Sequence, residues 1–450
     1  MLEHNDLKYL EQALAVLEQG FETLPAFDSS AQPARMRQVL NETASRLQNN
    51  FPYPHPLYAG QMLKPPHPVA RLAYMLALYI NPNNHALDGG RASSAMEKEA
   101  VANIAKMFGY ETHLGHLCAS GTVANLEALW VARHARAKGM VLISTQAHYT
   151  HTRMCELLQL PFRGVAVDTA GRMDVNALES ILKDQRVGTV VVTLGTTALG
   201  AVDPLPDILK LRERYDFRVH VDAAYGGYFT LVDDLDSNAR AAFDVIGQAD
   251  SIVVDPHKHG LQPYGCGCVL FRDPSVGRYY KHESPYTYFT SGDLHLGEIS
   301  LECSRPGAAA VALWATQQLL PMVRGGEFAL GLAASCQAAR VLHHHLTENS
   351  HYLVGPAPEL DIVVWALLAR DRAESSRHAQ KVFDAAAKQN LHLALLRVPE
   401  QLAGAWWPGL ERDAETVTAL RSCLMKPEHK DWLPRIISIL DTAIHESLSA

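Results

Sequence analysis

A lysine stands between two histidines in the stretch DPHKHGLQPYGCG, which covers residues 255–267 and directly follows an apolar run. Lysine is a poor residue for the end of a buried strand unless its amine is used there, because burial disfavours the charged form. A solvated lysine in a surface turn is the ordinary interpretation of such a stretch. The alternative is a catalytic lysine, since the amine of Lys258 could form a Schiff base with a carbonyl cofactor.

Polar residues also follow three other segments of the chain. Ser120, Gly121 and Thr122 open an expected helix, whose free backbone N–H groups favour a phosphate, although such residues are also ordinary helix caps. His148 follows MVLISTQA and could stack on a planar ligand, although a lone histidine is more often a plain core or surface residue. Asp222 ends the apolar run FRVHVD, where a buried carboxylate needs a partner.

Together these groups fit one cofactor, pyridoxal 5′-phosphate. Its phosphate needs a helix N-terminus, its aldehyde needs a lysine, and its ring nitrogen needs a carboxylate that keeps it protonated. The ring also needs an aromatic cover on one face and a small residue on the other, and Ala223 and Ala224 follow Asp222 directly. Four such groups in one chain order are far less expected by coincidence than any one of them, so we predict a pyridoxal phosphate site.

Alternating helical and strand-like segments are expected to position these groups. The runs MVLIS, VGTVVVTLG, FRVHVDAA and DSIVVD are short, apolar and rich in β-branched residues, which is typical of buried strands. SAMEKEAVANIAKMFG is expected to be a helix with Ser94 and Glu97 spaced as a capping box. Such alternation predicts a mostly parallel sheet covered on both faces, with ligands at the carboxyl ends of its strands.

Three segments are predicted along the chain. Residues 1–64 form a helical segment that ends in the proline-rich connector FPYPHPLYAG. Residues 65–320 form the large, cofactor-binding α/β domain, and residues 321–450 form a smaller α/β domain with strands in PELDIVVWALL, NLHLALLRVP and VTALRSCLMKP.

The composition is ordinary for a globular protein and excludes some classes of function. Of the 450 residues 48% are hydrophobic and 20% charged, and the net charge of −8 gives no sign of a nucleic-acid partner. No signal peptide and no membrane span are expected, because no apolar run reaches about 18 residues. Seven cysteines without framework spacing suit a reduced, cytoplasmic protein. The 22 histidines show no convincing ligand spacing, so no metal site is expected.

The motifs SGTVAN, AHYT, GTTALGAVD, HVDAAYGG and DPHKHG resemble, in order and spacing, those of the group II pyridoxal-phosphate-dependent decarboxylases. That group includes the glutamate, aromatic amino acid, diaminobutyrate and tyrosine/aspartate decarboxylases. The resemblance implies a fold type I α/β enzyme with a mostly parallel seven-stranded sheet. It also implies a homodimer with its active site at the subunit interface, which converts an L-amino acid to the amine and carbon dioxide.

By matching position, the resemblance gives each motif residue a role. Lys258 would form the Schiff base, His148 would stack on the ring, and Asp222 would pair with the ring nitrogen. Ala224 would lie beneath the ring, and Thr196 would bond near the cofactor hydroxyl or the substrate carboxylate. The residues around the phosphate would be Ser120, Gly121, Thr122 and His257.

The substrate side of the site is less well defined by the resemblance. LRSCLMKP resembles the family's C-terminal strand, so Arg421 is a candidate for binding a substrate carboxylate, with an exposed arginine of no special role as the alternative. Tyr286 and Tyr288, in SPYTYFTSGDLHLGE, are expected to approach a neighbouring active site.

One departure from the family pattern bears on the reaction. Decarboxylases of this group carry a tyrosine on a mobile loop after the segment that resembles ECSRPG, and it donates a proton to the substrate carbon. Here that stretch reads LLPMVRGGEFALGL, with Phe328 and no tyrosine. The loss would favour side chemistry such as aldehyde formation, or would leave the proton to another acid. Another fold type I lyase or an aldehyde synthase therefore stays open, as does, from a different class, a cofactor-free binding or scaffold protein.

Overall fold

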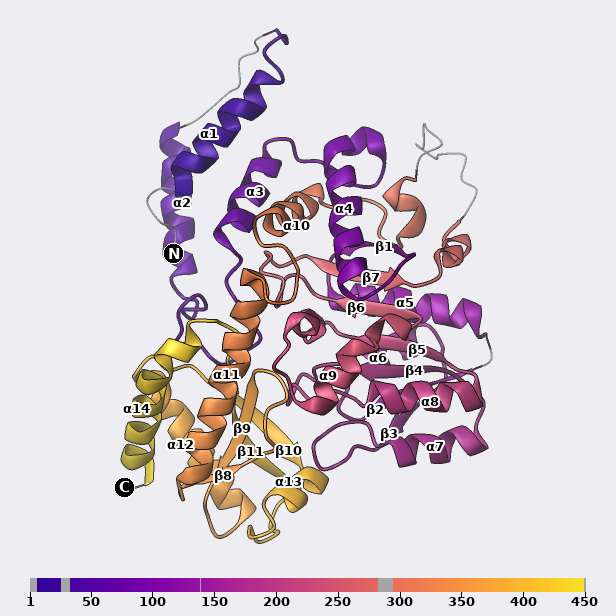
Figure 1. Ribbon diagram of the computed structural model, residues 1–450. Coiled ribbons are helices and arrows are strands. Elements are labelled where there is room, and N and C mark those ends of the chain that lie inside the picture. The colour runs from indigo at the N-terminus through magenta and orange to yellow at the C-terminus, as the bar shows by residue number, and fades with distance from the viewer. Residues whose placement is uncertain (1–5, 26–32, 138, 282–293, 449–450) are drawn as a thin grey trace.

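The computed structural model describes residues 6–25, 33–137, 139–281 and 294–448, and its body contains two sheets flanked by helices (Figure 1). The large sheet consists of β1 (Leu114–Cys118), β2 (Met140–Ser144), β3 (Phe162–Val165), β4 (Val187–Thr193), β5 (Arg218–Asp222), β6 (Ser251–Val254) and β7 (Gly267–Phe271). The small sheet consists of β8 (Tyr352–Val354), β9 (Ile362–Leu367), β10 (Ala394–Pro399) and β11 (Thr416–Cys423).

The helices that precede the small sheet are α1 (Asp6–Gln19), α2 (Pro33–Leu47), α3 (Pro68–Leu78), α4 (Arg91–Met107), α5 (Gly121–Ala135), α6 (Thr150–Leu157), α7 (Val175–Asp184), α8 (Leu205–Tyr215), α9 (Ser237–Asp244), α10 (Gly307–Leu319) and α11 (Glu327–Glu348). Those that follow its first strands are α12 (Arg372–Lys388), α13 (Glu400–Trp406) and α14 (His429–Leu448).

The large sheet has the strand order β1-β7-β6-β5-β4-β2-β3. The strands from β3 to β6 in this order are parallel, whereas β7 is antiparallel to both of its neighbours, β1 and β6. This confirms the predicted seven-stranded, mostly parallel sheet. The four runs predicted as its strands are β2, β4, β5 and β6, while β1 and β3 come from segments that were not predicted as strands.

The small sheet is antiparallel throughout, in the order β10-β11-β9-β8. Its three longer strands are those predicted from the sequence, and α11, α12 and α14 pack beside it (Figure 1). The two sheets fall within the ranges predicted for the second and third segments, and the limits of those segments stay a prediction.

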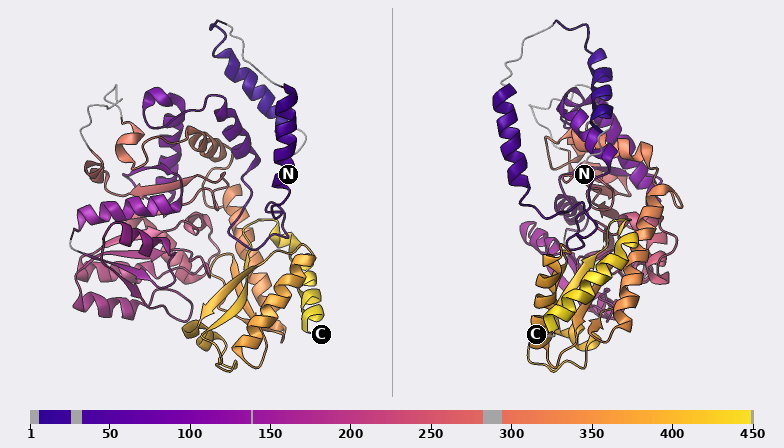
Figure 2. Two further views of the ribbon diagram at one scale, coloured as in Figure 1. Left: turned by 180° about the vertical axis from the view of Figure 1, so that it is seen from behind. Right: turned by 90° about the vertical axis from the view of Figure 1, so that its left-hand side faces the viewer.

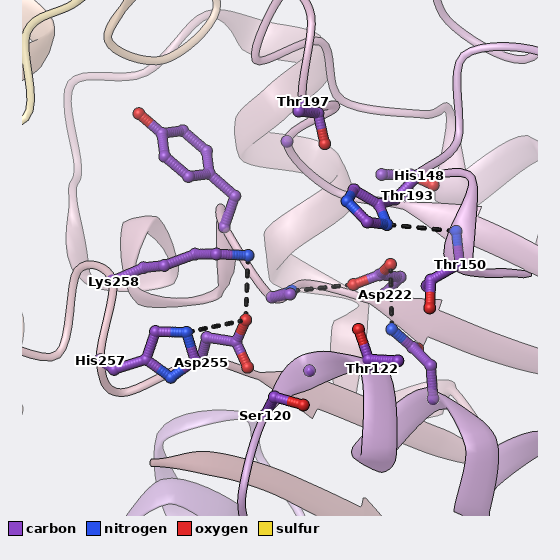
Figure 3. Close-up of a pocket in the computed structure, with 15 residues that line it drawn as sticks. Ser120, Thr122, His148, Thr150, Thr193, Thr197, Asp222, Asp255, His257 and Lys258 are labelled. Atoms are coloured by element: carbon purple, nitrogen blue, oxygen red, sulfur yellow. Dashed lines mark hydrogen bonds and ion pairs between the residues drawn. The ribbon is translucent and has the colours of Figure 1, made fainter. Parts of the chain in front are cut away.

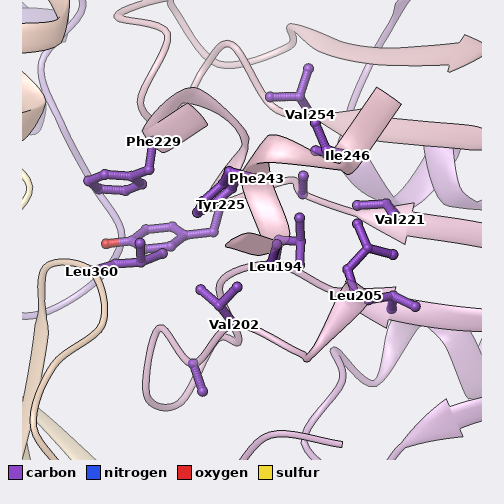
Figure 4. Packing of buried hydrophobic residues seen from close by; sticks show 14 of the residues in the cluster. Leu194, Val202, Leu205, Val221, Tyr225, Phe229, Phe243, Ile246, Val254 and Leu360 are labelled. Atoms are coloured by element: carbon purple, nitrogen blue, oxygen red, sulfur yellow. The ribbon is translucent and has the colours of Figure 1, made fainter. Parts of the chain in front are cut away.

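The core of the large domain holds the ends of the central strands in place. β4 is buried along its whole length, because it lies in the middle of a sheet covered on both faces. At the strand ends and just beyond them, Leu194, Val202 and Val254 pack with the rings of Tyr225 and Phe229 (Figure 4). The Tyr225 hydroxyl donates a hydrogen bond of 2.5 Å to Asp361, which ties this core to the smaller domain.

Helix α4 forms as expected, but the capping box predicted for it is wrong. The helix begins at Arg91 with Gly90 as its N-cap, so Ser94 lies inside the helix. Glu97 is buried and accepts hydrogen bonds from Asn84 and Arg305, which makes it part of a buried polar network and not a cap. The helix ends at Met107, and Gly109 follows with the left-handed φ of 80° that favours glycine.

Helix α2 stands away from the body of the molecule, whereas α1 packs against α3 (Figure 2). α2 exposes Met36, Val39, Leu40 and Leu47, whose spacing places them on one face of the helix. In the part of the chain that the structure describes, no helix combines the length and the apolar character that crossing a membrane requires.

Candidate active site

A cavity of about 180 Å³ opens where β4, β5 and β6 end and where α5 begins (Figure 3). The predicted site residues that line it are Ser120, Gly121, Thr122, His148, Asp222, Ala224, His257 and Lys258. They come from four separate segments of the sequence. The parallel strands bring their carboxyl ends to the same edge of the sheet, which is why these residues meet.

Lys258 reaches into this pocket from the loop after β6 and is paired with Asp255. Its Nζ lies 2.9 Å from Oδ2 of Asp255, three residues earlier in the chain. Burial favours the uncharged amine, but the charges of Asp255 and Asp222 outweigh it and raise the pKa of Lys258 above its ordinary value. The amine is therefore held as an ammonium group inside the pocket.

Asp222 lies at the end of β5 and accepts three hydrogen bonds. Oδ1 accepts the backbone N–H of Ala224 at 3.0 Å, and Oδ2 accepts from His151 Nε2 at 2.7 Å and from Asn125 Nδ2 at 3.3 Å. Burial favours the protonated acid, but the hydrogen bonds from His151 and Ala224 and the charge of Lys258 hold the pKa of Asp222 well below its usual range. Asp222 is thus a fixed carboxylate at the centre of the pocket (Figure 3).

The first turn of α5 forms another wall of the pocket. Ser120 is the N-cap, and its hydroxyl accepts the N–H of Val123 at 3.4 Å. A Cβ at Gly121 would lie 2.6 Å from Oδ2 of Asp255, so a larger residue here would displace that carboxylate. The remaining N–H groups of this turn and the helix dipole favour an anion, and Thr122 adds a hydroxyl to the pocket wall.

Two histidines flank the pocket on opposite sides (Figure 3). The ring of His148 accepts the N–H of Thr150 at Nδ1, 3.2 Å away, and burial lowers its pKa. His257 donates from Nδ1 to the carbonyl of Cys266 at 2.7 Å, and its Nε2 faces Asp255 at 3.6 Å. Burial also lowers the pKa of His257, so both rings favour the neutral form near neutral pH.

The structure places Thr197, and not Thr196, at the wall of the pocket. Thr196 is fully buried, and its hydroxyl accepts the N–H of Ala201 at 3.1 Å in the turn after β4. Arg421, on β11, is also buried, and it donates to the carbonyl of Thr197 at 2.9 Å and to the side chain of Gln61 at 3.2 Å. Arg421 therefore supports the rim of the pocket from the smaller domain.

Two further expectations concern residues on the substrate side. Tyr286 and Tyr288 lie outside the described residues. Phe328, in the first turn of α11, is buried, and its ring lies 5.4 Å from that of Tyr228. It is thus a packing residue of the core.

The residues present fit pyridoxal phosphate. The pocket holds a lysine amine for the aldehyde, a carboxylate for the ring nitrogen, a neutral histidine ring beside it, and a helix N-terminus with two hydroxyls for the phosphate. Asp255 adds a negative charge close to that helix terminus, and its Oδ1 is buried without a hydrogen-bond partner among the described residues. The ammonium of Lys258 offsets this charge.

Several residues of the site escaped prediction from the sequence. Asp255 stands three positions before Lys258, and its position in DPHKHG was the available signal. Asn125 lies one turn into α5 and His151 is the second residue of α6, and only the fold brings them to Asp222. No group of three or more metal-binding side chains is present in the described ranges of the chain.

Comparison with protein families and with curated proteins gives a consistent result. The conserved domain of pyridoxal-dependent decarboxylases matches residues 26–367. An L-tyrosine decarboxylase from Enterococcus faecium is 27% identical over 475 aligned residues, which cover 81% of this chain and 77% of that protein. A probable L-tyrosine/L-aspartate decarboxylase from Methanothermobacter thermautotrophicus is 31% identical over 309 residues, which cover 68% of this chain and 82% of that protein.

Solved structures share the fold over nearly the whole chain. TDC from Oryza sativa, solved with PLP and tryptamine, superposes with a TM-score of 0.78 at 17% identity and covers 98% of this chain and 99% of its own. Mouse CSAD superposes with a TM-score of 0.78 at 21% identity, and the match covers 95% of this chain and 91% of the mouse chain. The architecture is thus that of the fold type I pyridoxal phosphate enzymes, as predicted.

Proposed function

Because the chain belongs to the family of pyridoxal-dependent decarboxylases, which act on amino acids, we propose that the pocket around Lys258 is where it decarboxylates an L-amino acid. The observation that carries the proposal is that Lys258, Asp222, His148 and the first turn of α5 line one cavity although they are far apart in the sequence. The products would be the corresponding amine and carbon dioxide.

When bound, pyridoxal phosphate supplies an aldehyde that bonds covalently to amines and a ring that accepts the electron pair left behind by departing carbon dioxide. Around it, this chain would supply the binding groups. Ser120, Gly121, Thr122 and His257 would hold the phosphate, His148 would cover one face of the ring, and Ala224 would lie at the other. Thr197 takes the place at the pocket wall that was expected for Thr196.

Lys258 would be the covalent anchor of the cofactor and would later take up a proton as the substrate amine replaces it. Asp255 lies 2.9 Å from its Nζ and stabilises the ammonium form that results. Lys258 would thus hold its proton at Nζ while the substrate occupies the pocket.

Asp222 would keep a proton on the ring nitrogen. Its lowered pKa means that it is ionised near neutral pH, so it offers a full negative charge. A charge-assisted hydrogen bond in a site that excludes water is stronger than its counterpart in solution. Asp222 therefore sets the electron-accepting power of the site.

Arg421 would attract the carboxylate of the substrate at the rim. Its guanidinium is buried and positively charged, and its Nε has no hydrogen-bond partner among the residues the structure describes. A buried cation with an unused donor is suited to an anionic ligand. Gln61, which already contacts Arg421, would orient it.

The active protein would be a cytoplasmic homodimer with the active site at the subunit interface. The apolar face of α2 supports this assembly, because Met36, Val39, Leu40 and Leu47 are each more than half exposed on a helix that stands away from the body of its own chain. An apolar helix face of this kind is normally covered by a partner. Tyr286 and Tyr288 of one chain would approach the pocket of the other.

Aldehyde formation remains the second candidate reaction because Phe328 takes the place where a tyrosine was expected. Its side chain is buried and has no proton to donate, so another acid has to protonate the substrate carbon if the amine is the product. A slow or missing protonation would favour oxidative deamination, in which molecular oxygen as the oxidant takes up two electrons and ammonia, hydrogen peroxide and the aldehyde are released with the carbon dioxide.

One experiment distinguishes these outcomes. The purified protein, loaded with pyridoxal phosphate, is incubated with L-tyrosine and L-aspartate first, because relatives are named for these substrates, and then with the other amino acids and diaminobutyrate. Amine and carbon dioxide in equal amounts support decarboxylation. Carbon dioxide with aldehyde and no amine supports the second candidate, and turnover of no amino acid would contradict both.

A further inference from the structure

His151 lies directly behind Asp222 and does not itself line the pocket. It is the second residue of α6 and is fully buried. Its Nε2 lies 2.7 Å from Oδ2 of Asp222, which is the shortest of the three hydrogen bonds to that carboxylate. Because an ionised carboxylate only accepts hydrogen bonds, Nε2 carries the proton and donates it.

The other ring nitrogen of His151 limits how many protons the ring can hold. Nδ1 is buried and has no hydrogen-bond partner in the described part of the chain. A second ring proton at Nδ1 would be a buried N–H without an acceptor, which is unfavourable. The surroundings therefore accommodate one ring proton, on the side that faces Asp222.

The second side-chain donor to Asp222 is also held by neutral groups. Asn125 donates from Nδ2 to Asp222, and its Oδ1 accepts from Nε2 of His220 at 2.8 Å. Burial lowers the pKa of His220 to about 3, so this ring is neutral and accepts the hydroxyl proton of Ser251 at Nδ1, 2.9 Å away. Asp222 is consequently the charged member of a hydrogen-bonded network that also contains Asn125, His220 and Ser251.

Uncharged donors of this kind orient a carboxylate without neutralising it. A cationic partner in contact with Oδ2 would share its charge with Asp222 and weaken the attraction of Asp222 for any other positive group. A single N–H leaves the negative charge in place and fixes the rotation of the carboxylate about its Cβ–Cγ bond. His151 meets this requirement from α6, and Asn125 meets it from α5.

We propose that His151 is a positioning residue for the decarboxylation reaction: its Nε2–H fixes the Asp222 carboxylate so that the full charge is directed at the ring nitrogen of the cofactor. The inference rests on the proposed function, because it takes Asp222 as the partner of that nitrogen. His151 makes no contact with the substrate in this account and acts only through Asp222.

Two variants separate hydrogen bonding from packing. His151→Leu removes the donor and keeps apolar volume, whereas His151→Gln can return an N–H to about the same distance from the backbone. We expect His151→Leu to weaken pyridoxal phosphate binding by about 10- to 100-fold and to lower kcat by about the same factor, while KM stays within about three-fold of wild type. His151→Gln should recover most of the loss in cofactor binding and most of the loss in kcat. Equal losses in both variants, or a His151→Leu protein within about two-fold of wild type, would overturn the proposal.

A spectroscopic measurement tests the position of the proton without turnover and without cofactor. The protein is labelled with ¹⁵N-histidine, and the signals of His151 are assigned as those missing from the spectrum of His151→Gln. We expect a protonated Nε2 and a bare Nδ1 at neutral pH. A doubly protonated ring, or a proton on Nδ1 alone, would contradict the proposal.

The two levels of inference fail in different ways. A wild-type protein that binds no pyridoxal phosphate, measured by absorbance and by equilibrium dialysis, would count against the proposed function. A wild-type protein that binds the cofactor while His151→Leu binds it equally well would leave the proposed function intact and would contradict the role of His151.

Discussion

Lysine side chains line two separate cavities of this molecule, and their pKa values are shifted in opposite directions. The pocket of about 180 Å³ contains Lys258, while a larger cavity of about 540 Å³ between the N-terminal connector and the start of α11 is lined by Lys64 and Lys426. Lys426 is almost completely buried, and its Nζ donates to the carbonyl of Tyr58 at 2.6 Å. Burial lowers the pKa of Lys64 and of Lys426 to about 8.

The difference between the cavities comes from carboxylates. Asp255 lies within ion-pair distance of Lys258, whereas in the described chain no carboxylate lies so close to Lys64 or Lys426. Burial acts on all three amines in the same direction, and only at Lys258 is it outweighed. A buried amine with a low pKa is thus not sufficient for a catalytic site, since Lys426 has one without a carboxylate at ion-pair distance among the described residues.

The largest expected effect distinguishes the two cavities directly. Lys258→Ala should lower turnover by about four powers of ten or more, because it removes the covalent anchor of the cofactor. Borohydride should fix the cofactor to wild-type protein and to Lys426→Met but not to Lys258→Ala, as measured by mass spectrometry of peptides. A cofactor fixed to Lys64 or Lys426 would mean that the cofactor binds in the larger cavity and not in the pocket of Lys258.

Asp222→Asn should have the next largest effect. The neutral amide no longer keeps the ring nitrogen protonated, so kcat should fall by about a thousand-fold or more while the fold persists. Steady-state kinetics and thermal unfolding measure the two quantities. The matched control is Glu428→Gln, which removes an exposed carboxylate that lines the other cavity and should leave kcat within about two-fold. Similar losses in both variants would remove the distinction between the cavities.

Asp255→Asn tests why the pKa of Lys258 is raised while that of Lys426 is lowered. Removing this charge should let burial dominate at Lys258, so that its pKa falls toward that of Lys426. In cofactor-free protein, the rate at which an amine-reactive reagent labels Lys258 near pH 8 should rise by about ten-fold, while Lys426 in the same sample serves as the control. Unchanged labelling of Lys258 would show that Asp255 does not set its protonation.

The smallest expected effect concerns stability and pH. The pKa of Lys426 is lowered on folding from 10.5 to about 8, so the unfolded chain binds more protons between these values. The contribution of Lys426 to the free energy of unfolding should therefore rise with pH through this window, by up to about 3 kcal/mol. In urea unfolding, the free energy of unfolding of wild type relative to that of Lys426→Met should increase from pH 8 to pH 10. If the two proteins show the same pH dependence, the lowered pKa of Lys426 is contradicted.

The sequence predicted the parts of the fold whose local pattern agrees with their environment. β4 is buried on both faces and reads as a continuous run of β-branched residues, so it was recognised. β3 has three exposed residues at the edge of the sheet, and β8 has only three residues, so neither carries a clear pattern. The capping-box interpretation of Ser94 and Glu97 failed because residues far away in the sequence, among them Arg305, use Glu97 as a buried acceptor.

The site followed the same rule. Lys258, Asp222 and His148 were predicted because each ends or follows a recognisable strand, and the structure places all three at one pocket. The contacts of His151 and Asn125 depend on how α5 and α6 pack against β5, which a local pattern does not contain. The choice between Thr196 and Thr197 depends on the direction of one side chain in a turn.

The pairing of β1 with β7 has a consequence for how the protein is made. β1 leaves the ribosome early but can complete its place in the sheet only after β7 has been synthesised, since β7 is its partner strand. Ser120 follows β1, and Lys258 precedes β7, so both sides of the pocket depend on this late step. A nascent chain therefore exposes an unpaired β1 edge until β7 has been synthesised, and such an edge can pair with other strands.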